Sequence, residues 1–156
     1  MCAENLYWLN ELLNQQNIIE FFIKFSRFEY ALKTNGYHKQ RNGILIETNF
    51  DKFAKKYQRT SLPLELKNFL IFLNNDPVGK LTINGNYQKN PETGSDILQL
   101  LNYLRRIRNN LFHGVKYPNL SRYEQGSRGE RLINDGIKSI NFLVRLDEHV
   151  YTTYKG

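Results

Sequence analysis

Apolar residues recur every three or four positions along most of this chain of 156 residues. That spacing places them on one face of a helix, so it predicts a series of amphipathic helices. The predicted helices cover about residues 4–16, 17–35, 49–58, 61–74, 95–113 and 130–151. No internal repeat or linker separates them. The pattern therefore predicts one all-α domain over residues 1–156, a helical bundle with short additional helices.

Residues with special backbone preferences mark several of the predicted helix ends. Gly36 follows the second helix and supplies the left-handed residue that commonly ends one. Asn49 is a good N-cap for the third helix, and Pro77 disfavours helix at the residue before it. Gly136 lies inside the last predicted helix, where it weakens the helix locally and allows a neighbour to pack closely.

Two stretches between the helices lack the helical pattern. The first, around Gly43, is predicted to be a loop. The second, residues 77–93, contains Gly79, Gly85 and Pro91 together with several asparagines. Its residues 80–85 predict either a small hairpin arm or an irregular loop. Such a segment could lie over a site or simply connect two helices.

Positive charge is concentrated in one part of the chain. The formal net charge is +7, from 22 lysines and arginines against 15 acidic residues, and such an excess favours polyanionic partners. Residues 101–131 hold seven basic and two acidic residues, and seven minus two gives +5 of that total. The basic residues of this window are Arg105, Arg106, Arg108, Lys116, Arg122, Arg128 and Arg131. A polyanion is therefore expected to meet the chain here.

Cysteine content and hydropathy indicate the cellular compartment of the protein. The single cysteine, Cys2, cannot form an intrachain disulfide, which predicts a reducing, cytoplasmic setting. No apolar run approaches the roughly 20 residues that span a bilayer, and the first residues lack the pattern of a signal peptide. No membrane partner is expected.

The sequence RRIRNNLFHG, residues 105–114, ends the predicted helix inside the basic window. Asn109 and His113 are four residues apart and share a helical face, and Arg108 lies beside that face. Histidine transfers protons near neutral pH, and arginine binds phosphate oxygens through a planar charged fork. These three residues are therefore candidates for cleaving an RNA phosphodiester. The same spacing also fits an ordinary polar helix end with a capping histidine, and spacing alone does not decide between the two.

Other chemistries find less support in the sequence. The Asp, Glu, His and Cys residues show no spacing typical of metal ligands, and the glycines do not form a phosphate-binding loop between a strand and a helix. We therefore expect neither a metal nor another cofactor. His38 and His149 stand isolated in polar surroundings and are expected at the surface.

Two segments resemble a known family. The run from Arg108 to His113 is similar to the R-x(4–6)-H motif of the HEPN superfamily, including the polar residue after the arginine, and Gly114 also fits. Residues 25–33, FSRFEYALK, resemble the first long helix of small single-domain prokaryotic HEPN proteins. The two segments stand in the expected order with helical patterns between and after them, so the resemblance covers most of the chain.

This resemblance implies a HEPN-like bundle that forms a homodimer in which two such motifs face each other in one cleft. It also implies a metal-independent endoribonuclease of toxin–antitoxin or phage-defence type, which leaves 2′,3′-cyclic phosphate ends. Arg108 and His113 would be the catalytic pair and Asn109 the supporting polar residue. RNA would be the substrate, and an antitoxin or regulatory protein is a further possible partner.

Other residues receive supporting roles in this hypothesis. Glu29 would orient Arg108 from a neighbouring helix, and Tyr117 would stack on an unpaired base. The residues expected to guide the RNA backbone are Arg105, Arg106, Lys116, Arg122 and Arg128. The alternative is a non-catalytic HEPN module that binds RNA or a protein partner through the same basic surface.

Overall fold

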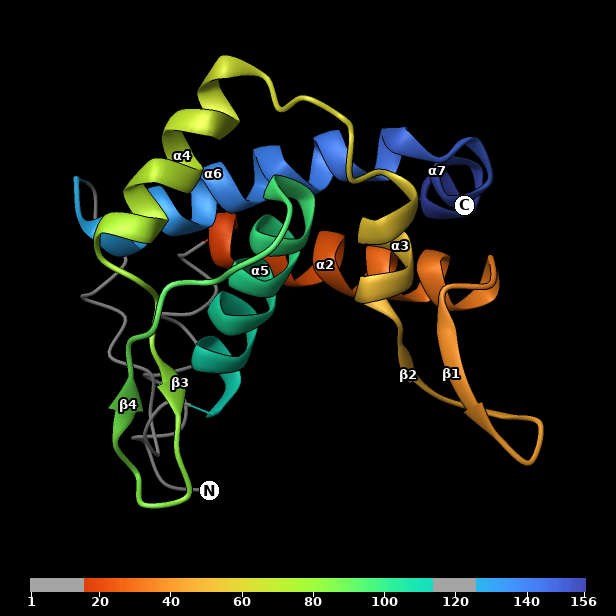
Figure 1. The fold of residues 1–156 in the computed structure, drawn as a ribbon, viewed down its shortest axis with the longest axis horizontal. Helices are drawn as coiled ribbons and strands as arrows, with labels where there is room; N and C mark the ends of the chain where they lie inside the picture. Colours follow the sequence, from red (N-terminus) through yellow and green to blue (C-terminus); the bar gives the residue numbers. More distant parts are fainter. Residues whose placement is uncertain (1–15, 114–125) are drawn as a thin grey trace.

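The computed structural model describes residues 16–113 and 126–156. Within them the chain forms six α-helices and two β-hairpins (Figure 1). The helices are α2 (Gln16–Thr34), α3 (Phe50–Lys56), α4 (Leu64–Asn75), α5 (Asp96–His113), α6 (Arg128–Leu143) and α7 (Glu148–Lys155). The strands are β1 (His38–Arg41), β2 (Ile44–Thr48), β3 (Lys80–Leu81) and β4 (Tyr87–Gln88). The prediction of a mainly helical protein is confirmed, while the helix predicted over residues 4–16 falls almost entirely outside the described residues.

The helix α2 supplies much of the hydrophobic core. Its apolar stripe is buried as the periodicity predicts, and Phe21, Phe25 and Phe28 are each at most 1% exposed. The helices α6 and α7 pack along α2, as Figure 1 shows. The described buried apolar residues form one continuous cluster that draws on every helix. No described helix is both long and apolar enough to cross a membrane.

Gly136 lets α6 approach α2 closely, as the sequence predicts. A Cβ atom at this position would lie 2.9 Å from Cε2 of Phe21. We expect Gly136→Ala to lower the free energy of unfolding by about 1 kcal/mol, because overpacking costs roughly 1–3 kcal/mol and the gain in helix propensity returns about 1. Urea unfolding of the two proteins checks this. Equal or greater stability of the variant would show that Phe21 moves aside without cost.

The stretch around Gly43, predicted to be a loop, is instead the tip of a β-hairpin. The strands β1 and β2 pair antiparallel, with Arg41 opposite Ile44. Asn42 and Gly43 have φ values of 53° and 75°, as a tight two-residue hairpin turn requires. The Asn-Gly pair is the local signal for this hairpin, and the helical periodicity on either side concealed it. The hairpin projects from the helical body, and Ile44, Leu45 and Ile46 are exposed on it (Figure 1).

The irregular stretch between α4 and α5 contains the second hairpin. Lys80 pairs with Gln88 and Leu81 with Tyr87, so the hairpin alternative predicted for this segment is confirmed. The chain then returns to the start of α5 through Glu92, whose backbone N–H donates to the hydroxyl of Tyr103 at 3.1 Å. This return brings Glu92 over α5.

The helix predicted over residues 130–151 is broken in the structure. α6 ends at Leu143, a 3₁₀ turn covers Val144–Leu146, and α7 begins after Asp147. Asp147 adopts an extended conformation, and its carboxylate accepts hydrogen bonds from the backbone N–H groups of His149 and Val150. Aspartate is among the strongest N-cap residues, so here capping overrides a continuous apolar periodicity.

The Asp147 carboxylate also joins α7 to the first hairpin and α3. Its Oδ2 accepts from the hydroxyls of Tyr37 at 2.6 Å and Tyr57 at 2.8 Å, and lies 3.3 Å from Nζ of Lys56. Burial by itself would raise the pKa of Asp147, but these donors and the N–H of Val150 hold that pKa well below its usual range. Asp147 is therefore a charged junction of three elements.

Candidate functional site

Arg108 lies on the last turns of α5 and reaches across to α2. Its Nη2 is 3.2 Å from Oε1 and 3.5 Å from Oε2 of Glu29. Its guanidinium carbon also lies 5.4 Å from the centre of the Phe25 ring. The contact expected between Glu29 and Arg108 is therefore present in the structure. Whether this contact serves catalysis stays a prediction.

The local sequence explains why Arg108 takes this position. Phe25 and Glu29 are four residues apart on α2, so they present an aromatic ring and a carboxylate on the same side. On α5, Leu104, Ile107 and Leu111 are buried, and Arg108 sits at the margin of that stripe. The side chains of Arg108 and Glu29 remain 28% and 21% exposed. The ion pair is thus held against the core yet open to solvent on one side.

One donor of Arg108 is left without a partner. Its Nε is buried and makes no hydrogen bond within the described part of the chain. A buried unsatisfied donor costs roughly 1–3 kcal/mol, which the ion pair with Glu29 and the contact with Phe25 offset. A shift that brings Nε to an acceptor would recover part of that cost.

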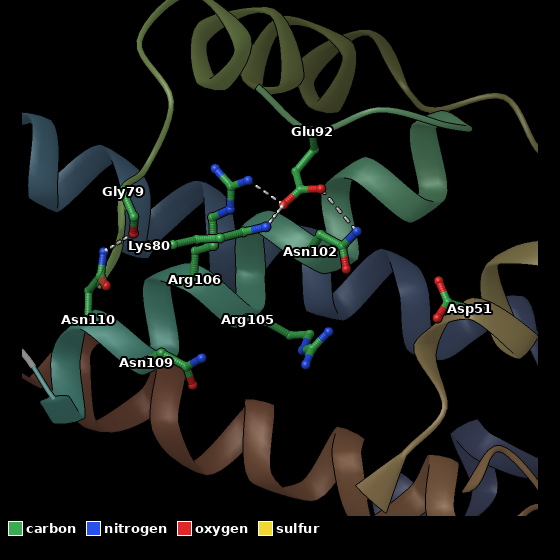
Figure 2. Close-up of a pocket in the computed structure, with 9 residues that line it drawn as sticks. All are labelled: Asp51, Gly79, Lys80, Glu92, Asn102, Arg105, Arg106, Asn109 and Asn110. Atoms are coloured by element: carbon green, nitrogen blue, oxygen red, sulfur yellow. Dashed lines mark hydrogen bonds and ion pairs between the residues drawn. The ribbon is translucent and has the colours of Figure 1, made fainter. Parts of the chain in front are cut away.

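A polar pocket of about 590 Å³ lies beside these residues, along another face of α5 (Figure 2). Its lining residues are Asp51, Gly79, Lys80, Glu92, Asn102, Arg105, Arg106, Asn109 and Asn110. Arg105 and Asn109 come from successive turns of α5, are both exposed and make no ion pair within the described part. Asn110 is occupied, because its amide donates to the carbonyl of Gly79 at 3.0 Å. Arg105 and Asn109 are thus accessible to a ligand.

The structure contradicts the role expected of Arg106. Its side chain is 4% exposed, and its guanidinium lies 2.5 Å from Oε1 of Glu92. It also donates to the carbonyls of Val78 at 2.8 Å and Asn90 at 2.6 Å. A guanidinium enclosed in this way cannot guide an RNA backbone. Arg106 instead fixes the connection between α4 and α5 against α5.

Arg128 is also engaged within the protein. It pairs with Asp76 at 3.3 Å, donates to the Asp76 carbonyl, and covers the Phe72 ring at 4.9 Å. These contacts join the start of α6 to the end of α4. With 34% of its side chain exposed, Arg128 could meet a phosphate only in competition with Asp76. Its expected role in RNA binding is weakened accordingly.

Several predicted residues cannot be placed. His113 is the last residue of α5, but its side chain lies outside the described residues, as do Lys116, Tyr117 and Arg122. The expected pairing of Arg108 with His113 therefore rests on the sequence.

Glu92 is one of the residues of this pocket that the sequence did not predict. Its side chain is 11% exposed and forms ion pairs with Arg106 and, at 3.5 Å, with Lys80. It also accepts a hydrogen bond from the amide of Asn102 at 3.2 Å. Figure 2 shows these three side chains converging on its carboxylate. Glu92 lies in an irregular segment, where no periodicity marks a residue as buried, so the sequence offers no signal for it.

The described residues bring no three His, Cys, Asp or Glu side chains together as a metal site would need. No family model, curated protein or solved structure matches the chain. The chemistry of the site therefore follows from its own residues.

Proposed function

We propose that the protein is a metal-independent endoribonuclease of toxin–antitoxin or phage-defence type, built as a HEPN-like bundle. The observation that carries this proposal is the position of Arg108, which Glu29 and Phe25 hold at the C-terminal end of α5. Asn109 is exposed on the next position, and His113 follows one turn later on the face of Asn109. An arginine, an amide and a histidine at one helix end are groups that such a reaction can use.

The proposed step is attack of a ribose 2′-OH on the adjacent phosphorus. A base removes the 2′-OH proton, the new P–O bond forms, and the bond to the 5′-oxygen breaks as an acid protonates that oxygen. The products are a 2′,3′-cyclic phosphate and a 5′-hydroxyl. His113 would transfer a proton, Arg108 would stabilise the charge on the non-bridging oxygens, and Asn109 would hold the phosphate in place.

The reaction needs both an acid and a base, whereas the motif of one chain contains a single histidine. Two chains placed with their α5 ends together would supply two histidines and two arginines. We therefore propose a homodimer with a composite active site. An antitoxin or other regulatory partner would act by covering that site.

One observation favours the alternative of a non-catalytic RNA-binding module. The Arg108 charge is already matched by Glu29, which reduces the positive field available to a transition state. For catalysis, the guanidinium must reach the phosphate with its remaining N–H groups or leave Glu29. The buried Nε has no hydrogen-bond partner within the described part of the chain, so it is one of the donors not used by Glu29.

Cleavage of single-stranded RNA in the presence of EDTA tests the proposal. We expect the wild-type protein to cleave and to leave 2′,3′-cyclic phosphate ends, and His113→Ala to cleave about 10²–10⁴ times more slowly. His149→Ala is the matched control, because His149 is an exposed histidine on α7, and it should retain full activity. RNA binding without strand scission by the wild-type protein would establish the alternative module instead.

A further inference from the structure

A second pocket, of about 570 Å³, lies between α2, the 3₁₀ turn and α7. Four of its lining residues are cations, namely Lys24, Arg27, Arg145 and Lys155. Glu20 is the one acidic residue of the lining. Four minus one gives a local balance of +3, and none of these residues belongs to the site around Arg108.

Within the described part of the chain, three of the four cations pair with no carboxylate. Lys24 pairs with Glu20 at 2.9 Å and donates to Asn141 at 3.1 Å. In contrast, Arg27, Arg145 and Lys155 form no ion pair within the described part of the chain. Their charges remain available to a ligand.

These three cations lie over tyrosine rings. The guanidinium of Arg27 is 5.4 Å from the centre of the Tyr154 ring. Arg145 lies 5.0 Å and Lys155 4.5 Å from the Tyr151 ring. Contact with an aromatic face restrains a cation without neutralising it, and a guanidinium held in this way keeps its N–H groups free for an anion.

The hydroxyl groups of Tyr151 and Tyr154 add neutral hydrogen-bond donors to the pocket. Neither hydroxyl has a hydrogen-bond partner among the described residues. Burial raises the pKa of Tyr154, although Lys24 and Arg27 oppose the shift, so its hydroxyl stays protonated at neutral pH. Apart from the paired Glu20, the charged and phenolic groups of this pocket are therefore donors. Such a set is complementary to an anion.

The apolar part of the pocket argues against a folded protein as the occupant. Ile23, 53% exposed, is its one strongly exposed aliphatic side chain, while Val144 is 1% exposed. Protein interfaces usually centre on a cluster of large apolar residues that become fully buried. The pocket instead offers cations and hydroxyl groups beside this limited aliphatic surface, and such groups are typical of contacts to nucleic acid backbones.

We propose that this pocket binds the phosphate backbone of single-stranded RNA. Arg27, Arg145 and Lys155 contact phosphate oxygens, and the edges of Tyr151 and Tyr154 meet the sugar or an unpaired base. The inference rests on the proposed function only in taking RNA as the ligand. It requires no cleavage.

The pocket and Arg108 face different directions. Arg27 and Glu29 are two residues apart on α2, which turns by about 200° over that distance. The pocket is therefore on the side of α2 opposite to the ion pair with Arg108. An RNA strand bound in this pocket is held away from the bond that is cut. The pocket therefore contributes to the affinity of the protein for RNA.

Fluorescence anisotropy with a short labelled oligonucleotide of 2′-O-methyl riboses tests the proposal, because such RNA cannot undergo 2′-OH attack. The variant Arg27→Ala with Arg145→Ala is compared with Arg59→Ala with Lys67→Ala. The control pair removes the same charge from exposed residues of other elements that make no ion pair within the described part. We expect the first variant to bind roughly tenfold more weakly and the second to bind like the wild-type protein.

The salt dependence distinguishes phosphate contacts from a loss of folding. Two contacts contribute about 0.7 each to the slope of log affinity against log salt, so the slope should decrease in magnitude by about 1.4 in the first variant. Arg27→Lys with Arg145→Lys keeps both charges and should restore most of the affinity.

Two results would overturn the inference. One is equal affinity of both charge-removal variants. The other is a labelled polyglutamate peptide that responds to the variants while the oligonucleotide does not, since this would assign the pocket to an acidic protein segment. Binding that depends on Arg27 and Arg145 in a protein that never cleaves RNA would refute the proposed activity and leave this inference intact.

Discussion

Arg108→Ala is expected to lower the rate of RNA cleavage by about 10²–10³-fold, the usual cost of removing one donor from a developing oxyanion. The reason is geometric as well as electrostatic. Glu29 and Phe25 restrict where the guanidinium of Arg108 can lie, so its charge acts at one place. Single-turnover cleavage in EDTA, at saturating protein, measures the chemical step directly.

Arg105→Ala is the matched control for this result. Arg105 lies on the same helix, is exposed and covers the Phe50 ring at 5.2 Å. Removing it changes the net charge equally, and we expect weaker RNA binding with little change in the saturated rate. Arg108→Lys keeps the charge but loses the planar fork, and it should remain strongly impaired. Equal rates for Arg108→Ala and the wild-type protein would remove Arg108 from the mechanism.

Asp147→Ala is expected to give the largest loss of stability, about 3 kcal/mol. It removes an N-cap, worth about 1 kcal/mol, and hydrogen bonds to a charged acceptor, worth about 1.5–3 kcal/mol. It also leaves the hydroxyl of Tyr37, a residue 5% exposed, without its partner. For a chain of this size the melting temperature should fall by about 6–12 °C. Thermal unfolding at neutral pH measures this.

Glu148→Ala provides the control for Asp147→Ala, because Glu148 is the exposed neighbour in the first turn of α7. Its effect should be below about 0.5 kcal/mol. The pH dependence gives a second check. The pKa of Asp147 is lowered in the folded protein, so its stabilisation is complete above the unfolded-state pKa of about 3.9. The difference between wild type and variant should shrink as the pH falls below about 4. A constant difference down to pH 2 would exclude the carboxylate charge as the cause.

The break before α7 shows why some of the fold could not be predicted. Val144 and Val150 continue the apolar periodicity of α6, so the pattern extends through the break. Asp147 is compatible with an exposed helical position as well as with a cap. Tyr37 and Tyr57, which come from distant parts of the chain, donate to its carboxylate and stabilise the capping position. The hairpin at Asn42 and Gly43 is different, since its turn signal is local and can be recognised in the sequence.

Three arginines of α5 also show the difference between what the sequence predicts and what the tertiary structure decides. The sequence places Arg105, Arg106 and Arg108 in one basic window and predicts that all three contact RNA, with Arg108 in the catalytic pair. In the structure Arg105 is exposed beside Phe50, Arg106 is enclosed around Glu92, and Arg108 lies against Glu29. A helix turns by about 100° per residue, so neighbours in sequence point to different surroundings. The segments that pack there decide what each charge does.

The sequence by itself determined the helical character of the protein, most of the buried stripes, and the motif from Arg108 to His113 as the candidate for chemistry. These properties repeat along a helix face and can be recognised within one segment. Only the tertiary structure decided that Arg106 is structural, that Glu92 pairs with it and that Arg27 and Arg145 share a pocket with two tyrosines. The reason is physical. The partner of a charged side chain is set by which distant segment packs against it, and no local pattern encodes that choice.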